Sequence, residues 1–255
     1  MLLVSLAVIV AVAAAVRSTW SPCGLSMLST ITPLAEQSRG HRFRSTAAWF
    51  IVGSIVGGAT LGLGCALLAA VVGLLGPSAS VVLALAAVAA LITSCSDLEV
   101  FGVQLPIHPR QVNEVWLGKY RSWVYGSGFG WQIGAGFVTY IMTAAVYLTV
   151  ALAALTAEPL TALAVGVLFG TVRGLAILLA AGITSTEKLT SFHRRFDAFA
   201  EPVRRALIGV QLAVAVVAAS ALWAPVLAIV AAGAISVATV VLAIAARRRP
   251  AHVAG

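Results

Sequence analysis

Charged residues are scarce in this sequence. Only 9% of its 255 residues are charged, whereas 61% are apolar and the mean hydropathy is +1.04. A soluble domain carries about 25% charged residues, so this composition excludes a soluble globular protein. It also excludes disorder, which requires low hydrophobicity and high charge. At about 20 apolar residues per span, the length predicts one all-α bundle of about six to eight membrane helices.

Cysteine and metal-ligand clusters are also lacking. The three cysteines are too few for a disulfide framework, and any single pairing leaves one over. The four histidines are scattered, and no spacing of His and Cys indicates a metal site. No Gly-x-Ser-x-Gly turn occurs and no carboxylate pair lies in the apolar segments, so a hydrolase is not indicated. We therefore predict neither a metal nor a cofactor.

Seven apolar segments are predicted to span the membrane. The first, Leu2–Leu34, is one long span broken by Pro22 and Pro33, because proline removes a backbone donor. The last apolar stretch is read as two spans, since a single helix of about 40 residues would be about 60 Å long, twice the hydrocarbon thickness. The other predicted spans are Thr46–Leu75, Ala79–Ser94, Trp123–Leu155, Pro159–Ile183, Ala206–Trp223 and Pro225–Ala246.

The net charge of +8 is distributed unevenly over the connections. All but two of the 16 Lys and Arg residues lie in alternate connections and in the tail, and the intervening connections hold none. By the positive-inside rule the basic side is the cytoplasm. This predicts a bacterial plasma-membrane protein with its N-terminus outside and its C-terminus in the cytoplasm. The basic segments are 35–45, 97–122, 184–205 and 247–249.

Basic segments can also bind nucleic acid or anionic lipid. No basic surface interleaved with aromatic residues occurs, so we predict no nucleic-acid partner. The lipid bilayer is the predicted partner, and the arginine triplet before Pro250 could contact its anionic headgroups.

A thiol follows a proline in the hydroxyl-rich part of the first span. The segment Trp20–Ser29 reads Trp-Ser-Pro-Cys-Gly-Leu-Ser-Met-Leu-Ser, with Pro22 opening the helix beside Cys23. Positive charge stabilises a reactive thiolate, and Arg17 lies six residues earlier. Cys23 is thus a candidate catalytic residue, with Pro22 as part of its motif. The alternative is that Cys23 is a small packing residue.

The Ser21-Pro22-Cys23 motif, late in a first span that starts outside, resembles the first helix of the cytochrome c biogenesis protein CcdA family. It is similar also to the membrane domain of the thiol–disulfide interchange protein DsbD. The resemblance implies two inverted three-helix repeats and electron transfer through a membrane cysteine pair. It also implies two partners, a cytoplasmic thioredoxin-like protein and an extracytoplasmic thiol protein.

Applied to this chain, the resemblance places the first repeat at 1–98, a cytoplasmic loop at 99–122, and the second repeat at 123–223. Residues 224–255 add an extra span and a basic tail. The family's second Pro-Cys belongs in the fourth span, after the glycine-rich stretch that begins at Tyr125. There this sequence has Thr139 and Tyr140 instead, so the second redox cysteine is absent.

Two other cysteines are candidate redox partners for Cys23. Cys65 lies past the middle of the second span, and Cys95 lies at the cytoplasmic end of the third. Both could equally be packing residues. A dithiol relay requires one thiolate to attack a disulfide that includes the other. A lone thiol can form mixed disulfides only with another molecule.

Two arginines are left unexplained by topology. Arg173 lies about ten residues from either end of its span, too deep for its side chain to reach the surface easily. An ionisable residue at this depth indicates function by default. It could bind an anionic solute, stabilise a Cys23 thiolate, or pair with helix-end carbonyls. The depth of Arg17 depends on where the first span begins.

Glycine pairs and one long loop complete the inventory. Gly53–Gly57 and Gly130–Gly134 are small-xxx-small pairs, predicted to pack helices closely, although glycine-rich halves could also permit alternating access. The loop Leu105–Arg121 is predicted to hold a short amphipathic helix, with docking of a partner as a second use.

The sequence therefore favours a membrane thiol–disulfide electron relay, or a derived role in maturation of extracytoplasmic proteins or cytochrome c. Whether the chain is an enzyme stays open at this point. One alternative is a non-redox transporter with inverted repeats that binds a small anionic solute at Arg173. Another is a membrane subunit that positions a partner through its cytoplasmic loops.

Overall fold

The structure is a computed structural model that describes residues 1–106 and 115–222. The seventh predicted span, Pro225–Ala246, lies outside these residues, as does much of the loop Leu105–Arg121. Of that loop, the described part contains α6 (Trp116–Lys119), a single helical turn. Within the described residues, five helices are long and apolar enough to cross a membrane, so the chain is a helical membrane protein.

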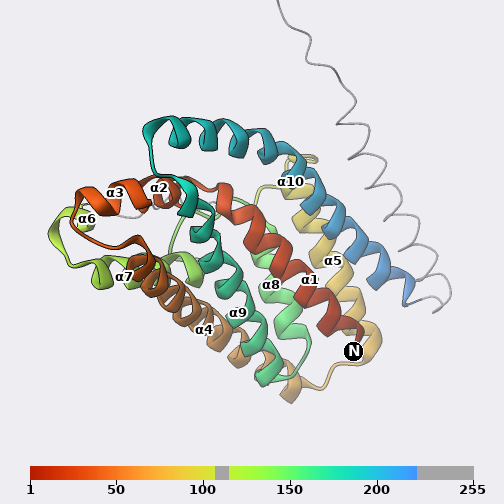
Figure 1. The fold of residues 1–255 in the computed structure, drawn as a ribbon. Coiled ribbons are helices and arrows are strands. Elements are labelled where there is room, and N and C mark those ends of the chain that lie inside the picture. Colours follow the sequence, from red (N-terminus) through yellow and green to blue (C-terminus); the bar gives the residue numbers. More distant parts are fainter. Residues whose placement is uncertain (107–114, 223–255) are drawn as a thin grey trace, which may run out of the picture.

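The described residues contain helices and no strand (Figure 1). Two of the long helices each end in a 3-10 turn: α1 (Leu2–Arg17) runs into η1 (Ser18–Trp20), and α9 (Pro159–Leu175) runs into η2 (Ala176–Gly182). The remaining elements are α2 (Pro22–Thr30), α3 (Pro33–Ser38), α4 (Phe43–Leu75), α5 (Ala79–Leu98), α7 (Ser122–Ala135), α8 (Ala145–Leu155) and α10 (Thr186–Ser220).

Local sequence explains several helix ends. Helix α4 ends at Leu75 because Gly76 adopts a left-handed φ of 55°, which glycine accepts without strain. The side chain of Ser78 then caps α5 by accepting a hydrogen bond from the Val81 amide. Both boundaries coincide with those predicted for the second and third spans.

Two predicted spans differ from the observed helices. The fourth is not continuous, because residues 136–144 between α7 and α8 are not helical. The sixth is longer than predicted: α10 begins at Thr186, so most of the connection 184–205 is helical and continues through Pro202. Figure 1 shows the first half of α10 crossing the end of the bundle and its second half running beside α5.

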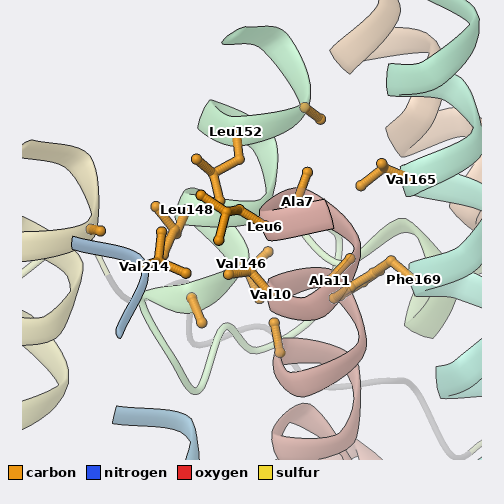
Figure 2. Packing of buried hydrophobic residues seen from close by; sticks show 14 of the residues in the cluster. Leu6, Ala7, Val10, Ala11, Val146, Leu148, Leu152, Val165, Phe169 and Val214 are labelled. Atoms are coloured by element: carbon orange, nitrogen blue, oxygen red, sulfur yellow. The ribbon is translucent and has the colours of Figure 1, made fainter. Parts of the chain in front are cut away.

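The largest apolar cluster surrounds α1. Helix α1 packs against α8, α9 and α10, and Figure 2 shows Leu6, Val10 and Ala11 directed toward these neighbours. Several of the α1 residues in contact are alanines with no exposed surface. Small side chains allow close helix approach, which drives association where lipid offers no hydrophobic gain.

Glycines hold α4 against α7 and α9. A Cβ atom added to Gly53 would lie 2.1 Å from the Ser127 carbonyl oxygen, and one added to Gly134 would lie 2.0 Å from that of Ser54. Between α4 and α9, a Cβ on Gly166 would lie 2.3 Å from the Gly62 Cα. Side chains cannot occupy these positions, so the packing role predicted for the glycine pairs is confirmed.

The two ends of the bundle carry different connecting segments. Helices α2, α3 and α6 lie at the end away from the N-terminus, close to the start of α10 (Figure 1). The short connection between α4 and α5 lies at the other end, as does the start of α9. The longer connections therefore gather at one end of the bundle.

Candidate functional site

Cys23 lies directly after the first break, which consists of residues 18–21 between α1 and α2. After η1, Ser21 is extended, with φ −65° and ψ 154°, and its hydroxyl accepts a hydrogen bond from the Gly24 amide at 3.2 Å. Pro22 occupies the first position of α2, where its missing N–H costs no helical hydrogen bond. Cys23 is therefore the second residue of a new helix. The sequence predicted this break, and the cap explains how it forms.

Gly24 completes the first break, although no pattern in the sequence singled it out. A Cβ atom at this position would lie 2.2 Å from the Thr19 carbonyl oxygen. The chain turns back so closely at η1 that only glycine fits after the cysteine. The glycine after Pro22 and Cys23 is thus a steric requirement of the turn.

Arg173 of α9 reaches the first break and is 3% exposed. Its Nη1 donates to the Ile133 carbonyl oxygen at 2.7 Å, and its Nη2 donates to the Ser18 carbonyl oxygen at 3.3 Å. The guanidinium carbon lies 5.7 Å from the centre of the Phe169 ring, a cation–π contact. Of the three roles predicted for Arg173, pairing with helix-end carbonyls is the one these bonds display.

Cys23 and Arg173 belong to the same site. The Cys23 side chain is 1% exposed and lies close enough to the guanidinium to interact with it electrostatically. Beside them is a small cavity of about 20 Å³, room for one water molecule. Arg173 lines it together with Thr19, Gly24, Met27, Leu28, Phe50, Ile133, Ala176 and Ile177. The Arg173 Nε is buried and has no hydrogen-bond partner among the described residues.

The second break, residues 136–144 between α7 and α8, contains the position of the missing cysteine. Helix α7 ends at Ala135, and Gly136 follows with a φ of 74°. Thr139 is 1% exposed, and its hydroxyl is without a partner in the part of the chain that the structure describes. Tyr140 is half-buried and packs against the apolar cluster that contains Cys23. The two breaks therefore share one cluster.

The other two cysteines lie apart from this cluster. Cys65 is buried in the apolar core around α1, 15 residues along α4 from Phe50, which is itself in the Cys23 cluster. At 1.5 Å per residue this separation is about 22 Å. Cys95 is half-buried on α5, a helix that packs against α10 and α8. No disulfide joins any of the three, all of which are described.

Arg17 belongs to a second polar cluster, centred on Asp97. Asp97 Oδ1 accepts from the Ala144 amide at 2.8 Å, and Oδ2 accepts from the Thr143 hydroxyl and from Gln211 Nε2, the latter at 2.9 Å. Arg17 is 7% exposed and interacts electrostatically with this carboxylate. The sequence placed Asp97 in a loop, whereas it lies in the last turn of α5.

A third polar cluster surrounds Glu36, a residue that the sequence did not indicate. Glu36 has no exposed surface, and its carboxylate accepts hydrogen bonds from the Tyr125 hydroxyl at 2.7 and 2.8 Å. It also accepts from Thr46 and forms an ion pair with Arg39 at 3.0 Å. An acidic residue at the start of the arginine-rich connection 35–45 was the available signal. The cluster ties α3 to α4 and α7.

The chain is similar to the methylamine utilization protein MauF. It is 30% identical over 172 residues to that of Paracoccus versutus, a match that covers 66% of this chain and 61% of the relative. It is 31% identical over 187 residues to that of Methylophilus methylotrophus, covering 69% and 62%. The Paracoccus denitrificans protein is 30% identical over 173 residues, covering 66% and 60%.

These matches set the scope of the comparison. The chain spans about three fifths of the length of the MauF relatives that it matches. No family model matches the chain, and no solved structure matches it significantly. The resemblance to CcdA and DsbD therefore continues to depend on the Ser-Pro-Cys motif and the broken spans.

Proposed function

We propose that this chain is a membrane component of methylamine utilization that acts in maturation of an extracytoplasmic protein through thiol–disulfide exchange at Cys23. The observation that carries the proposal is the arrangement of Cys23 at the first turn of α2, next to the buried Arg173 guanidinium. The positive end of a helix dipole and a guanidinium both favour a negatively charged sulfur. The names of the MauF relatives supply the physiological context.

The exchange balances without an external oxidant or reductant. The Cys23 thiolate attacks a disulfide of the client protein, forms a mixed disulfide and releases one client thiolate. A second client thiolate then attacks the client sulfur of the mixed disulfide. This closes a new client disulfide and returns the Cys23 thiolate. The proton that leaves the Cys23 thiol passes to solvent before the attack. A single cysteine suffices for this exchange.

A relay within the chain would need a second thiol near Cys23. Cys65 lies about 22 Å along α4 from Phe50, a member of the Cys23 cluster. Cys95 is on α5, so neither cysteine is in that cluster. The family position for the second cysteine is occupied by Thr139 and Tyr140. We therefore favour exchange with a client over electron transfer between two cysteines of this chain. In this proposal the client is the extracytoplasmic thiol protein. A cytoplasmic thioredoxin-like protein is needed only when the second client thiolate fails to attack: its dithiol then reduces the mixed disulfide to the Cys23 thiol and a client thiol and is itself oxidised to a disulfide.

We infer that the helices form two inverted repeats, 1–98 and 123–223. Three sets of contacts support this. The presumed equivalents α4 and α9 pack together through glycines, and α5 packs against α10. Helix α1 packs on α9 as α7 packs on α4. The basic connections then face the cytoplasm, with the N-terminus outside, as the positive-inside rule predicts.

Cys23→Ser tests the proposed function directly. In cells whose growth on methylamine depends on this chain, we expect Cys23→Ser to abolish growth, whereas Cys65→Ser, the same change at another buried cysteine, preserves it. Acid quenching followed by non-reducing electrophoresis should trap a mixed disulfide that is absent from Cys23→Ser. Full growth of the Cys23→Ser strain would overturn the proposal.

A transporter for a small anionic solute is the second candidate. The partnerless Arg173 Nε beside a cavity favours it, whereas the two carbonyl bonds of the same guanidinium and the small cavity oppose it. Cys23→Ser separates the candidates, whereas Arg173→Lys keeps the charge that both of them use. Anion transport should retain part of its rate in this variant, while a Cys23→Ser transporter should be fully active. A scaffold subunit would tolerate both changes.

A further inference from the structure

The second break is held at its two ends by charged residues from other helices. At its start, Arg173 of α9 binds the Ile133 carbonyl oxygen, one turn before Gly136. At its end, Asp97 of α5 binds the Thr143 hydroxyl and the Ala144 amide, immediately before α8 begins. Residues 136–142 lie between these two attachments, and Tyr140 is among them.

The same two residues also act on the first break. Arg173 donates to the Ser18 carbonyl oxygen in η1. Asp97 attracts Arg17, the last residue of α1. Both charged residues thus act at the start of the first break, Arg173 through a hydrogen bond and Asp97 through longer-range attraction, while each holds one end of the second. Arg173 is buried and Asp97 is half-buried, and a charge withdrawn from water fixes geometry because leaving it unpaired is costly.

Asp97 also accepts hydrogen bonds from α10. Gln211, which has no exposed surface, donates its Nε2 to Asp97 from α10, and Arg204 Nη2 donates to the Asp97 carbonyl oxygen at 3.0 Å. Two buried atoms of residues that interact with Asp97, Arg17 Nη1 and Gln211 Oε1, lack a partner among the described residues.

We propose that Asp97 is a positioning residue that fastens the second break to the first and thereby keeps Cys23 closed. Asp97 does not touch the sulfur. It holds the start of α8, so that Tyr140 stays packed against the cluster around Cys23. The opening that exposes Cys23 to a client then requires these bonds to be released. The idea that the opening admits a client rests on the proposed function. The role of Asp97 in keeping Cys23 closed does not, because the accessibility of Cys23 can be measured without a client.

The test is the rate at which each cysteine of the full chain reacts with N-ethylmaleimide in native membranes, resolved by mass spectrometry. In Asp97→Asn we expect Cys23 to react about tenfold faster or more, because local opening becomes more frequent. Cys65, which is 2% exposed and lies in the other apolar cluster, should keep its rate. Asp197→Asn makes the same chemical change at an exposed position of α10 and should alter neither rate.

Two results would overturn the proposal. If Cys23 and Cys65 both accelerate equally, Asp97 serves general stability alone, and if neither accelerates, Asp97 does not hold the breaks. Should Asp97→Asn fail to accumulate, Thr143→Val removes one of its bonds from the opposite side and is judged by the same ratio. A Cys23→Ser strain that grows on methylamine would refute the proposed function and leave these labelling rates unaffected.

Discussion

The two helix breaks contrast in how they are made. The first is encoded locally: Ser21 caps α2, Pro22 starts it, and Gly24 allows the close return to Thr19. The second spans residues 136–144, contains no proline, and is held by Arg173 and Asp97 from distant helices. A break with a full set of capping signals is therefore visible in the sequence, whereas the second has only Gly136 as a local signal and otherwise depends on tertiary contacts that the sequence does not display.

Arg173 serves both breaks, so its removal should have the largest effect. Arg173→Met leaves the Ser18 and Ile133 carbonyl oxygens without their donors. Hydrogen bonds to charged groups contribute about 1.5–3 kcal/mol each, so we expect a loss of about 3 kcal/mol in the free energy of unfolding, measured by denaturant titration in detergent micelles. Arg173→Lys, which can keep one bond, should lose about half as much. An unchanged midpoint in Arg173→Met would show that neither break depends on the guanidinium.

Gly24→Ala should disturb the first break alone. The added methyl group meets a backbone oxygen that cannot move aside, and such overpacking costs about 1–3 kcal/mol. We expect a loss near the upper end, about 2–3 kcal/mol, in the same titration. Gly64→Ala is the matched control because open space surrounds that position in α4. It should be neutral or stabilise by up to about 1 kcal/mol through helix propensity. Equal losses in both variants would contradict the close return at η1.

Thr143→Val should loosen the second break alone. Thr143 donates to the Asp97 carboxylate, and its oxygen accepts from the Ala145 amide at 3.2 Å. Removing a hydrogen bond to a charged group should cost about 1.5–2 kcal/mol. Thermal unfolding in micelles should report a lower Tm. A Tm equal to that of the unaltered protein would mean that the carboxylate finds another donor.

Thr139→Val should have the smallest effect, with the opposite sign. The Thr139 hydroxyl is buried and partnerless among the described residues, so replacing it with a methyl group removes an unsatisfied polar atom. We expect the free energy of unfolding to stay equal or to rise by up to about 1 kcal/mol. The same change four residues apart thus distinguishes the bonded threonine from the unbonded one. A clear loss in Thr139→Val would indicate that its hydroxyl has a partner, such as water.

The sequence predicted the helical membrane class, the break before Cys23, and the helix ends at Leu75 and Ala79, because proline, serine caps and Gly76 act on their own neighbours. It missed the inward role of Asp97, which looked like a loop residue near the cytoplasm. It also missed Glu36, whose partners Tyr125 and Thr46 are distant or unremarkable in sequence. Such polar clusters depend on which helices meet, and no local pattern specifies that. The continuous α10 escaped prediction because its first half is polar.

The contact between α4 and α9 has a mechanical consequence. Where Gly62 meets Gly166, backbone lies directly on backbone, with no layer of side chains that could compress or repack. The two helices are therefore expected to move as one rigid unit. Ser54 strengthens their contact by donating to the Gly170 carbonyl oxygen at 2.7 Å. A movement that exposes Cys23 is therefore expected to shift the two broken spans relative to the α4–α9 pair, because α4 and α9 are packed too closely to move against each other.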